Sequence, residues 1–489
     1  MIGAYAKARA VEAGVAQPVA TVAHVHVSRR PLVLVPLALA GEANAPLAAL
    51  VGAAQHAPTL LVVPQPRDRE LRFSFAASLA DVVLSYVSAF PVEPPADEDG
   101  YPAAADGPQL LVPNRAGIGF VRLLGRSTRF RRADGPYPVD PSVPLLGRWL
   151  TWFAERAEHP GSSTMLAATE ALTLHWATGQ SAFEDNNLAA LLGWIEPPPG
   201  LTGAQAAREA EDPLRWPPAG PATDPVFDNE VLRPLVTAYS EAAEGSAPRR
   251  RAVATLERAI AGQLEPTWQL MWRTVDRLCS LPPGASVAGR WEADCSAFAG
   301  FATYLSEGGL PQARRDGAVA AARRLATLER ARATYDAARA FDDPLVMAEH
   351  RVTGEAFAGT VVAVDAERRV TNSKGNLVTR PLVTVRTDDP ALLPVGTAVA
   401  APTRPKQGGV VHEVGAGTVT IELDKGFGRA KTIPPGVLPS PGEAITYTSV
   451  LASAIRGPAL PTAEETPWTH GGPPQPYEPT EEDAGEVWE

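Results

Sequence analysis

The stretch from Gly354 to Leu451 constrains the fold more than any other part of this 489-residue chain. In it, Val419, Ile421 and Leu423 alternate with polar residues, which is the period of a strand with one buried face. Gly415-Ala-Gly417, directly before this run, is typical of a hairpin turn. Similar short runs, separated by Gly- or Pro-containing turns, stand at 359–364, 381–386, 395–400 and 409–414. Five or six such strands suit a small closed barrel, so we predict a β-barrel over residues 350–451.

The first 140 residues mix strand-like and helical patterns. Apolar runs that favour buried strands are followed by turn residues, and one run of small apolar residues favours a helix. The expected strands are 21–27, 31–40, 59–63, 109–112 and 117–124, and the expected helix is 45–55. We therefore predict an α/β or α+β domain over residues 1–140.

The middle of the chain is predicted to be helical. Residues 145–345 show apolar residues at helical spacing, interrupted by a Pro-rich linker near 195–227. The last helix, before the barrel, is rich in arginine. Together these segments predict a multidomain α+β chain with an α/β region, a helical middle and a small β-barrel.

The end of the sequence differs from the rest in charge. Residues 457–489 contain eight acidic residues and no lysine or arginine, together with many prolines. Such a segment cannot bury enough apolar surface to offset the entropy of ordering, so we predict a disordered acidic tail. Trp488, inside its most acidic stretch, is the candidate anchor of a partner-binding peptide; the alternative is a solubilising tail.

Basic residues concentrate in the predicted barrel. The formal net charge of the chain is −11, yet residues 356–437 hold ten lysines and arginines against seven acids. A basic surface is what a phosphate backbone requires. The candidate nucleic-acid-binding residues are Arg368, Arg369, Lys374, Arg404, Lys406, Lys425, Phe427, Arg429 and Lys431. An ordinary solvated face is the alternative, and Phe427 either stacks on a base or plugs the mouth of the barrel.

The sequence shows no pattern that predicts a catalytic site. A phosphate loop needs Gly-Lys-Ser/Thr, and none of the five lysines follows a glycine, so no ATP hydrolysis is expected. His24 and His26 share a strand face in this interpretation, but no third ligand is placed, and we predict neither metal nor cofactor. Without an apolar run long enough to cross a membrane or a signal peptide, we expect a cytoplasmic protein with no membrane partner.

Residues 290–451 resemble a known accessory unit in the order of their segments. A helix is followed by Gly-Thr-Val-Val, Gly-Val-Val-His-Glu-Val and Gly-Thr-Val-Thr-Ile-Glu-Leu, and then by Leu-Pro-Ser-Pro-Gly-Glu at 438–443. This order is similar to the stalk helices and β-barrel of superfamily-one 5′-to-3′ helicases, the group that contains the nonsense-mediated-decay helicase. The resemblance implies a barrel that contacts a nucleic-acid strand and its partners. The motor lobes of that family have no counterpart here.

The sequence therefore predicts a non-enzymatic accessory protein of a nucleic-acid-processing, helicase-type system. Its expected partners are single-stranded nucleic acid and a separate ATPase or helicase subunit. Two alternatives from other classes remain open. One is an enzyme whose active site lies in residues 20–140, and the other is a pure protein-interaction scaffold.

Overall fold

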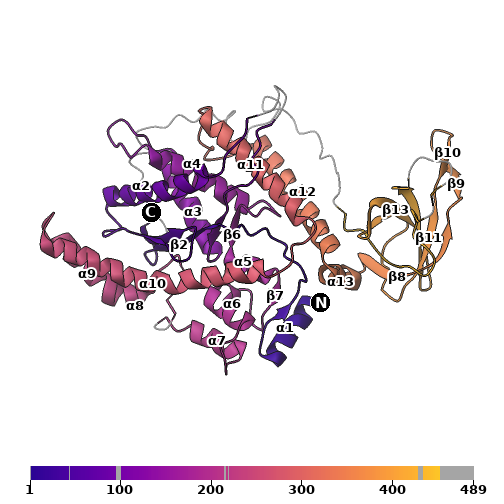
Figure 1. The fold of residues 1–489 in the computed structure, drawn as a ribbon, viewed down its shortest axis with the longest axis horizontal. Coiled ribbons are helices and arrows are strands. Elements are labelled where there is room, and N and C mark those ends of the chain that lie inside the picture. Colours follow the sequence, from indigo (N-terminus) through magenta and orange to yellow (C-terminus); the bar gives the residue numbers. More distant parts are fainter. Residues whose placement is uncertain are drawn as a thin grey trace.

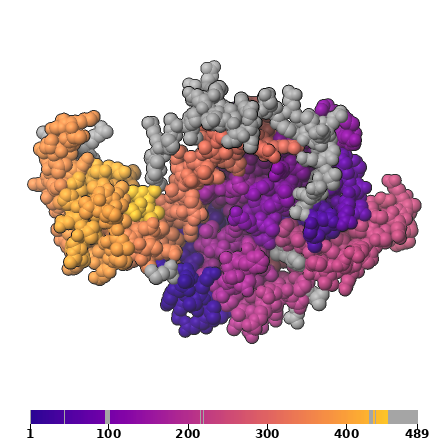
Figure 2. All heavy atoms as spheres, turned by 180° about the vertical axis from the view of Figure 1, so that it is seen from behind, coloured from indigo at the N-terminus to yellow at the C-terminus, as the bar shows by residue number. Residues whose placement is uncertain are grey.

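The structure, a computed structural model, divides into a large body and a small barrel that stands to one side of it (Figure 1). It describes residues 2–42, 45–94, 101–213, 216–217, 220–427, 433–434 and 436–451. The space-filling view from behind shows the barrel as a separate lobe that meets the body at a narrow neck (Figure 2). The coarse prediction of mixed helix and strand with a C-terminal β-barrel is confirmed.

A five-stranded sheet forms the centre of the body, in the order β4-β3-β2-β5-β6. β2 pairs antiparallel with β3 and parallel with β5, and β5 pairs parallel with β6. Every residue of β2 and β3 is buried, because helices cover both faces of the sheet. The strands are β2 (Leu32–Ala38), β3 (Pro46–Gly52), β4 (Thr59–Val62), β5 (Leu110–Val112) and β6 (Met165–Ala167).

One face of the sheet packs against helices α2, α3, α4 and α11. Leu32 and Leu34 of β2 share an apolar cluster with Leu79 of α2, Phe153 of α4 and Phe298 of α11. The helices on this face are α2 (Arg69–Ser88), α3 (Arg115–Thr128), α4 (Ser142–Ala157) and α11 (Val287–Ser306). Among the described helices, α2 is the one whose length and composition would let it cross a membrane, and half of its apolar window is buried in this cluster.

The opposite face packs against α5, α6, α7 and the long helix α10. Trp268 and Ile260 of α10 lie in one cluster with Val33 and Val35 of β2. The helices on this side are α5 (Ala168–Thr173), α6 (Leu188–Ile195), α7 (Gly203–Ala210) and α10 (Ala247–Cys279). The peripheral elements of the body are α1 (Ile2–Ala13), β1 (Gln17–Pro18), β7 (Trp176–Ala177), η1 (Glu184–Asn186), α8 (Pro225–Phe227), η2 (Asp228–Leu232) and α9 (Arg233–Glu241).

The barrel is closed, with six antiparallel strands in the order β11-β14-β13-β12-β15-β8. Closure follows from β8, which pairs with both β11 and β15. Val419, Ile421 and Leu423 of β14 point into the core with exposed fractions of 1%, 0% and 0%, which confirms the predicted alternation. The six strands are β8 (Ala356–Asp365), β11 (Leu382–Arg386), β12 (Ala398–Ala401), β13 (Arg404–Gly415), β14 (Thr418–Lys425) and β15 (Ala444–Thr448), and a hairpin of β9 (Arg369–Thr371) and β10 (Leu377–Thr379) is appended.

Helices α12 (Ala318–Asp342) and α13 (Pro344–Thr353) connect the body to the barrel. Asp343 stands between them and caps α13 by accepting a hydrogen bond from the Leu345 N–H at 2.9 Å. The same carboxylate accepts hydrogen bonds from the N–H and hydroxyl of Thr21, at 2.7 and 3.0 Å, and so ties the connection to the body. Gly354, with φ of 80°, ends α13 in the left-handed conformation and turns the chain into β8.

Three of the expected elements are different in the structure. The expected helix at 45–55 is strand β3. An uninterrupted apolar run shows neither the helical nor the strand periodicity, so the sequence does not distinguish the two, and pairing with β2 makes it a strand. The expected strand at 117–124 lies inside helix α3, which Asn114 caps through the Gly117 N–H. The expected strand at 21–27 forms only an isolated bridge, between Ala23 and Pro283.

Two segment boundaries also look different in three dimensions. Strand β6 comes from the segment predicted as helical, 145–345, and completes the sheet that begins in residues 1–140. The stretch 195–227, expected as a linker, contains helix α7, whose Thr202 and Gln205 form a capping box. Its alanines pack on α6, so this stretch belongs to the body. The predicted tail, residues 457–489, lies outside the described residues.

Candidate functional site

Two arginines among the predicted cations are half-buried on the barrel and paired with acidic residues. Arg368 donates to Glu422 at 2.7 Å and to the Arg380 carbonyl at 3.1 Å. Arg404 forms a fork with Glu443, at 3.0 and 3.1 Å, and donates to the Val437 carbonyl at 2.8 Å. The Ser440 N–H, and with it the Arg404 guanidinium, lowers the pKa of Glu443. These arginines join strands and loops of the barrel to one another, and their charge is partly neutralised by Glu422 and Glu443.

Three lysines in the described part of the barrel differ from these arginines. Lys374, Lys406 and Lys425 are exposed, and their side chains make no hydrogen bond or ion pair with any described residue. Lys425 lies opposite Gly408 across the β13–β14 ladder, where a Cβ on Gly408 would be 2.3 Å from the Lys425 Cε. The glycine therefore leaves room for the lysine stem to lie flat on β13. Lys374 stands in the turn between β9 and β10.

The remaining predicted residues fall into three groups. Arg369 is exposed on β9. Phe427 is 9% exposed and belongs to the apolar cluster of the barrel, together with Leu423 and Leu438. This burial favours the second of the two interpretations, a side chain that plugs the barrel. Arg429, Lys431 and Trp488 lie outside the described residues.

The crevice at the C-terminal ends of the parallel strands is where an enzyme of α/β architecture usually binds its ligand. Here the chain itself fills that crevice with residues 220–223. Ala38 donates its N–H to the Pro221 carbonyl at 2.5 Å and accepts from the Thr223 N–H at 3.1 Å. Asn114, after β5, donates to the Gly220 carbonyl at 3.2 Å. Backbone groups of residues 220–223 therefore take up hydrogen-bonding positions at the ends of β2 and β5.

A cavity of about 640 Å³ opens beside this crevice, between the ends of β2 and β4 and helix α9. Arg67 forms an ion pair with Glu42 there, and Asp228 accepts from the Ala40 N–H at 3.3 Å. In the described part of the chain, no three His, Cys, Asp or Glu side chains are grouped so as to hold a metal ion. Besides the Arg67–Glu42 ion pair, the charged side chains of Asp228, Arg233 and Glu241 line this cavity.

His24 and His26, considered from the sequence as neighbours on one strand face, have different surroundings. The His26 ring stacks on Trp291 with 4.1 Å between centroids, whereas His24 is fully buried and stacks on His175 at 5.5 Å. The His24 Nε2 lies 3.3 Å from Asp343. Burial, together with the Arg339 charge, lowers the pKa of His24 to about 4. His24 is thus a neutral side chain at the joint between body and barrel.

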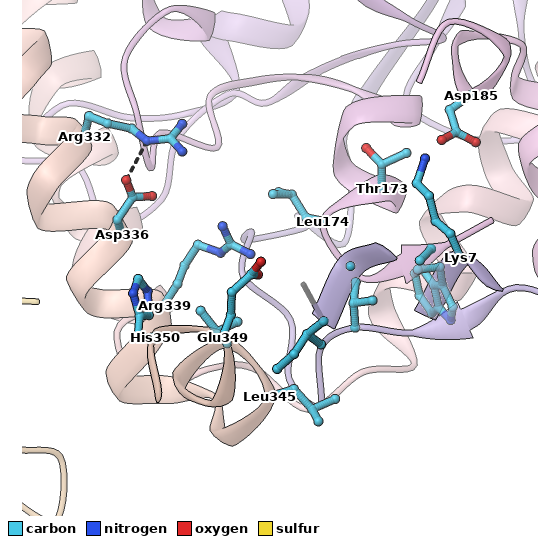
Figure 3. A pocket seen from close by; sticks show the side chains of 16 residues that line it. Lys7, Thr173, Leu174, Asp185, Arg332, Asp336, Arg339, Leu345, Glu349 and His350 are labelled. Carbon is cyan, nitrogen blue, oxygen red and sulfur yellow. Dashed lines mark hydrogen bonds and ion pairs between the residues drawn. The ribbon is translucent and has the colours of Figure 1, made fainter. Parts of the chain in front are cut away.

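Another cavity, of about 520 Å³, lies at this joint between α1, β7 and the helices α12 and α13 (Figure 3). Its polar side chains come from opposite walls, with Lys7 and Asp185 on the body and Arg332, Arg339 and His350 on the barrel-bearing helices. Sequence reasoning did not find this pocket, because its residues come from segments more than 300 positions apart. No spacing rule joins residues at that separation.

Comparisons with known proteins give no relative for this chain. No family model matches it, no curated protein matches it, and no solved structure matches it. The similarity of residues 290–451 to the helicase stalk and barrel therefore stays a prediction.

Proposed function

We propose that this chain is a non-enzymatic accessory protein of a nucleic-acid-processing, helicase-type system, in which the barrel contacts single-stranded nucleic acid or the motor subunit that handles it. The observation that carries the proposal is a difference between two paired arginines and three exposed lysines in the described part of the barrel. Arg368 and Arg404 are bonded to acids of the barrel, while Lys374, Lys406 and Lys425 are exposed and unpaired within the described structure. A mobile ammonium without a partner suits a phosphate backbone, which it can follow without fixed geometry.

The position of the barrel also supports this proposal. It is carried away from the body on α12 and α13, so a strand can approach it from several sides (Figure 1). The filled crevice at residues 220–223 and the lack of a Gly-Lys-Ser/Thr sequence support a role without catalysis. A cytoplasmic location, beside a separate ATPase, is part of the proposal.

The expected binding is weak and dependent on salt. Three lysine–phosphate contacts on a single strand correspond to a slope of about −2 in a plot of log K against log salt concentration. Fluorescence anisotropy with a labelled oligonucleotide at low salt measures both the affinity and the slope. We expect the charge-reversed variant Lys374→Glu/Lys406→Glu/Lys425→Glu to bind at least about tenfold more weakly and to flatten the slope.

A matched control changes the charge equally at a distance. Arg208→Glu/Arg251→Glu/Arg258→Glu reverses three exposed arginines on α7 and α10 of the body. Its affinity should stay within about threefold of the wild type at a salt concentration of about 0.1 M, where exposed charges more than about 10 Å apart are largely screened. Equal losses in the two variants, or no measurable binding by the wild type, would overturn the assignment of the lysines to nucleic acid.

A further inference from the structure

The pocket at the joint combines an apolar floor with a few polar groups at its walls, as small-molecule sites do. Leu174 and Trp176 on the body side and Leu345 and Val346 on α13 supply apolar surface. The close view shows the charged side chains arranged around this surface, with Lys7 and Asp185 facing the arginines of α12 across the cavity (Figure 3). An organic ligand that entered here would contact the body and the barrel-bearing helices at the same time.

The formal charges of the pocket side chains cancel, but these side chains differ in whether they already have a hydrogen-bonding partner within the protein. Asp185 accepts from Thr178 at 2.7 Å and from Gln180 at 3.0 Å. Asp336 accepts from Arg332 at 2.7 Å, and the Lys7 ammonium donates to the Gln180 carbonyl at 3.0 Å. Most charged groups of the pocket are therefore already engaged by the protein.

Arg339 is different. Its guanidinium makes no hydrogen bond or ion pair with a described residue, and its Nε is buried without an acceptor. Its contact is with the Tyr335 ring, whose centroid lies 5.7 Å from the Arg339 Cζ. The guanidinium extends beside Glu349 at the wall of the cavity (Figure 3). The buried Nε is closed to a ligand, but the two terminal nitrogens of the guanidinium have no acceptor among the described residues, and a carboxylate or phosphate can accept from both at once.

We propose that this pocket binds a small organic anion, with its carboxylate or phosphate group on Arg339 and its apolar part on Trp176, Leu345 and Val346. Since Arg339 belongs to α12 while Trp176 belongs to the body, the bound anion links the two parts of the joint. Ligand binding then holds α13, and the barrel that follows it, against the body. This inference does not depend on what the barrel itself contacts.

The probe for the test is 8-anilinonaphthalene-1-sulfonate, an aromatic anion whose fluorescence rises in apolar surroundings. The full-length chain is titrated with it, and Arg339→Met, which keeps the apolar stem and removes the charge, is compared with Arg330→Met. Arg330 is an exposed arginine of the same helix. We expect Arg339→Met to weaken binding by at least about tenfold and Arg330→Met by less than about twofold. Equal affinity of wild type and Arg339→Met overturns the proposal.

Two further measurements keep the outcome decisive. Arg339→Lys retains the positive charge, so its affinity for the probe should lie between those of the wild type and Arg339→Met. If Arg339→Lys lost as much affinity as Arg339→Met, the loss would come from damaged packing, which would contradict the proposal. Hydrogen exchange of residues 344–353 should slow when the probe binds the wild type, and unchanged exchange would refute the link across the joint. Competition by benzoate and by phenyl phosphate separates the two anion classes, and displacement by neither also counts against the site.

Discussion

The body and the barrel are each built on a core of their own, and the joint between them is built differently. The body buries two large apolar clusters, one on each face of its sheet, and the barrel buries a separate one around Phe357 and Tyr447. Between them, the described residues form a small buried cluster of Ala340, Met347 and Ala356. The joint is held largely by polar contacts, which centre on Asp343. Apolar cores give stability to each part, whereas the polar joint sets how the parts are connected.

This difference means that the two parts should respond separately to substitution. The sequence provides a convenient probe, since eight of the ten tryptophans lie between residues 149 and 291 and none lies in 350–451. Tryptophan fluorescence therefore follows the body, while hydrogen exchange of β13 and β14 follows the barrel. The three predictions below test the separation, beginning with the largest effect.

Phe153→Ala should lower the free energy of unfolding of the body by about 3–5 kcal/mol. The ring is fully buried and lies 5.1 Å from that of Trp152 between centroids, so the loss leaves a cavity that tryptophan fluorescence detects. Urea unfolding followed by this fluorescence measures the change. Protection of β13 and β14 should stay as in the wild type. The matched variant Phe357→Ala should destabilise the barrel and leave the unfolding of the body unchanged. If either variant lowered the stability of both parts equally, the body and the barrel would unfold as one unit.

Acid should weaken the joint before either core. Burial lowers the pKa of both His24 and His175 to about 4, so the unfolded chain takes up protons at these positions from about pH 6.5 downwards while the folded chain does not. Although burial alone raises it, the pKa of Asp343 is lowered overall by hydrogen bonds from Thr21 and Leu345. The two histidines therefore destabilise the fold progressively as the pH falls from about 6.5 through 4, whereas the stabilisation from Asp343 is lost only at lower pH, below the ordinary carboxyl pKa of 3.8.

Hydrogen exchange of α13 between pH 7 and 4, corrected for the intrinsic rates, measures this effect. We expect α13 to lose protection while β2, β3, β13 and β14 keep theirs. His24→Asn should reduce the pH dependence, and His56→Asn should leave it unchanged because His56 is exposed. Simultaneous loss of protection in the joint and in the cores would contradict the comparison.

The sequence was informative where one face of an element is buried and the other is not. Strand β14 was predicted correctly for this reason, since Val419, Ile421 and Leu423 alternate with half-exposed residues. Strand β3 was not, because it is buried on both faces and its apolar run has no period. For the candidate site, the sequence located the cations but not their partners. Glu443 stands 39 residues after Arg404, so only the fold shows that the two form an ion pair.

The smallest predicted effect separates the two kinds of barrel cation from each other. Arg404→Met removes a fork to Glu443 and a hydrogen bond to the Val437 carbonyl, and should lower the stability of the barrel by about 1–2 kcal/mol. Lys406→Met, two positions away, removes an exposed charge without a described partner and should change stability by less than about 0.5 kcal/mol.

Hydrogen exchange of β13 and β14 under conditions that allow global opening measures both variants, and oligonucleotide anisotropy supplies the second readout. Arg404→Met should change exchange more than affinity at a temperature where the barrel is folded, and Lys406→Met should change affinity more than exchange. These opposite effects are expected because Arg404 contacts acidic and backbone groups of the barrel, whereas the Lys406 side chain makes no hydrogen bond or ion pair with a described residue. If Lys406→Met destabilised the barrel as much as Arg404→Met, the lysine would be a structural residue as well, and the surface proposed for nucleic acid would lose one of its three lysines.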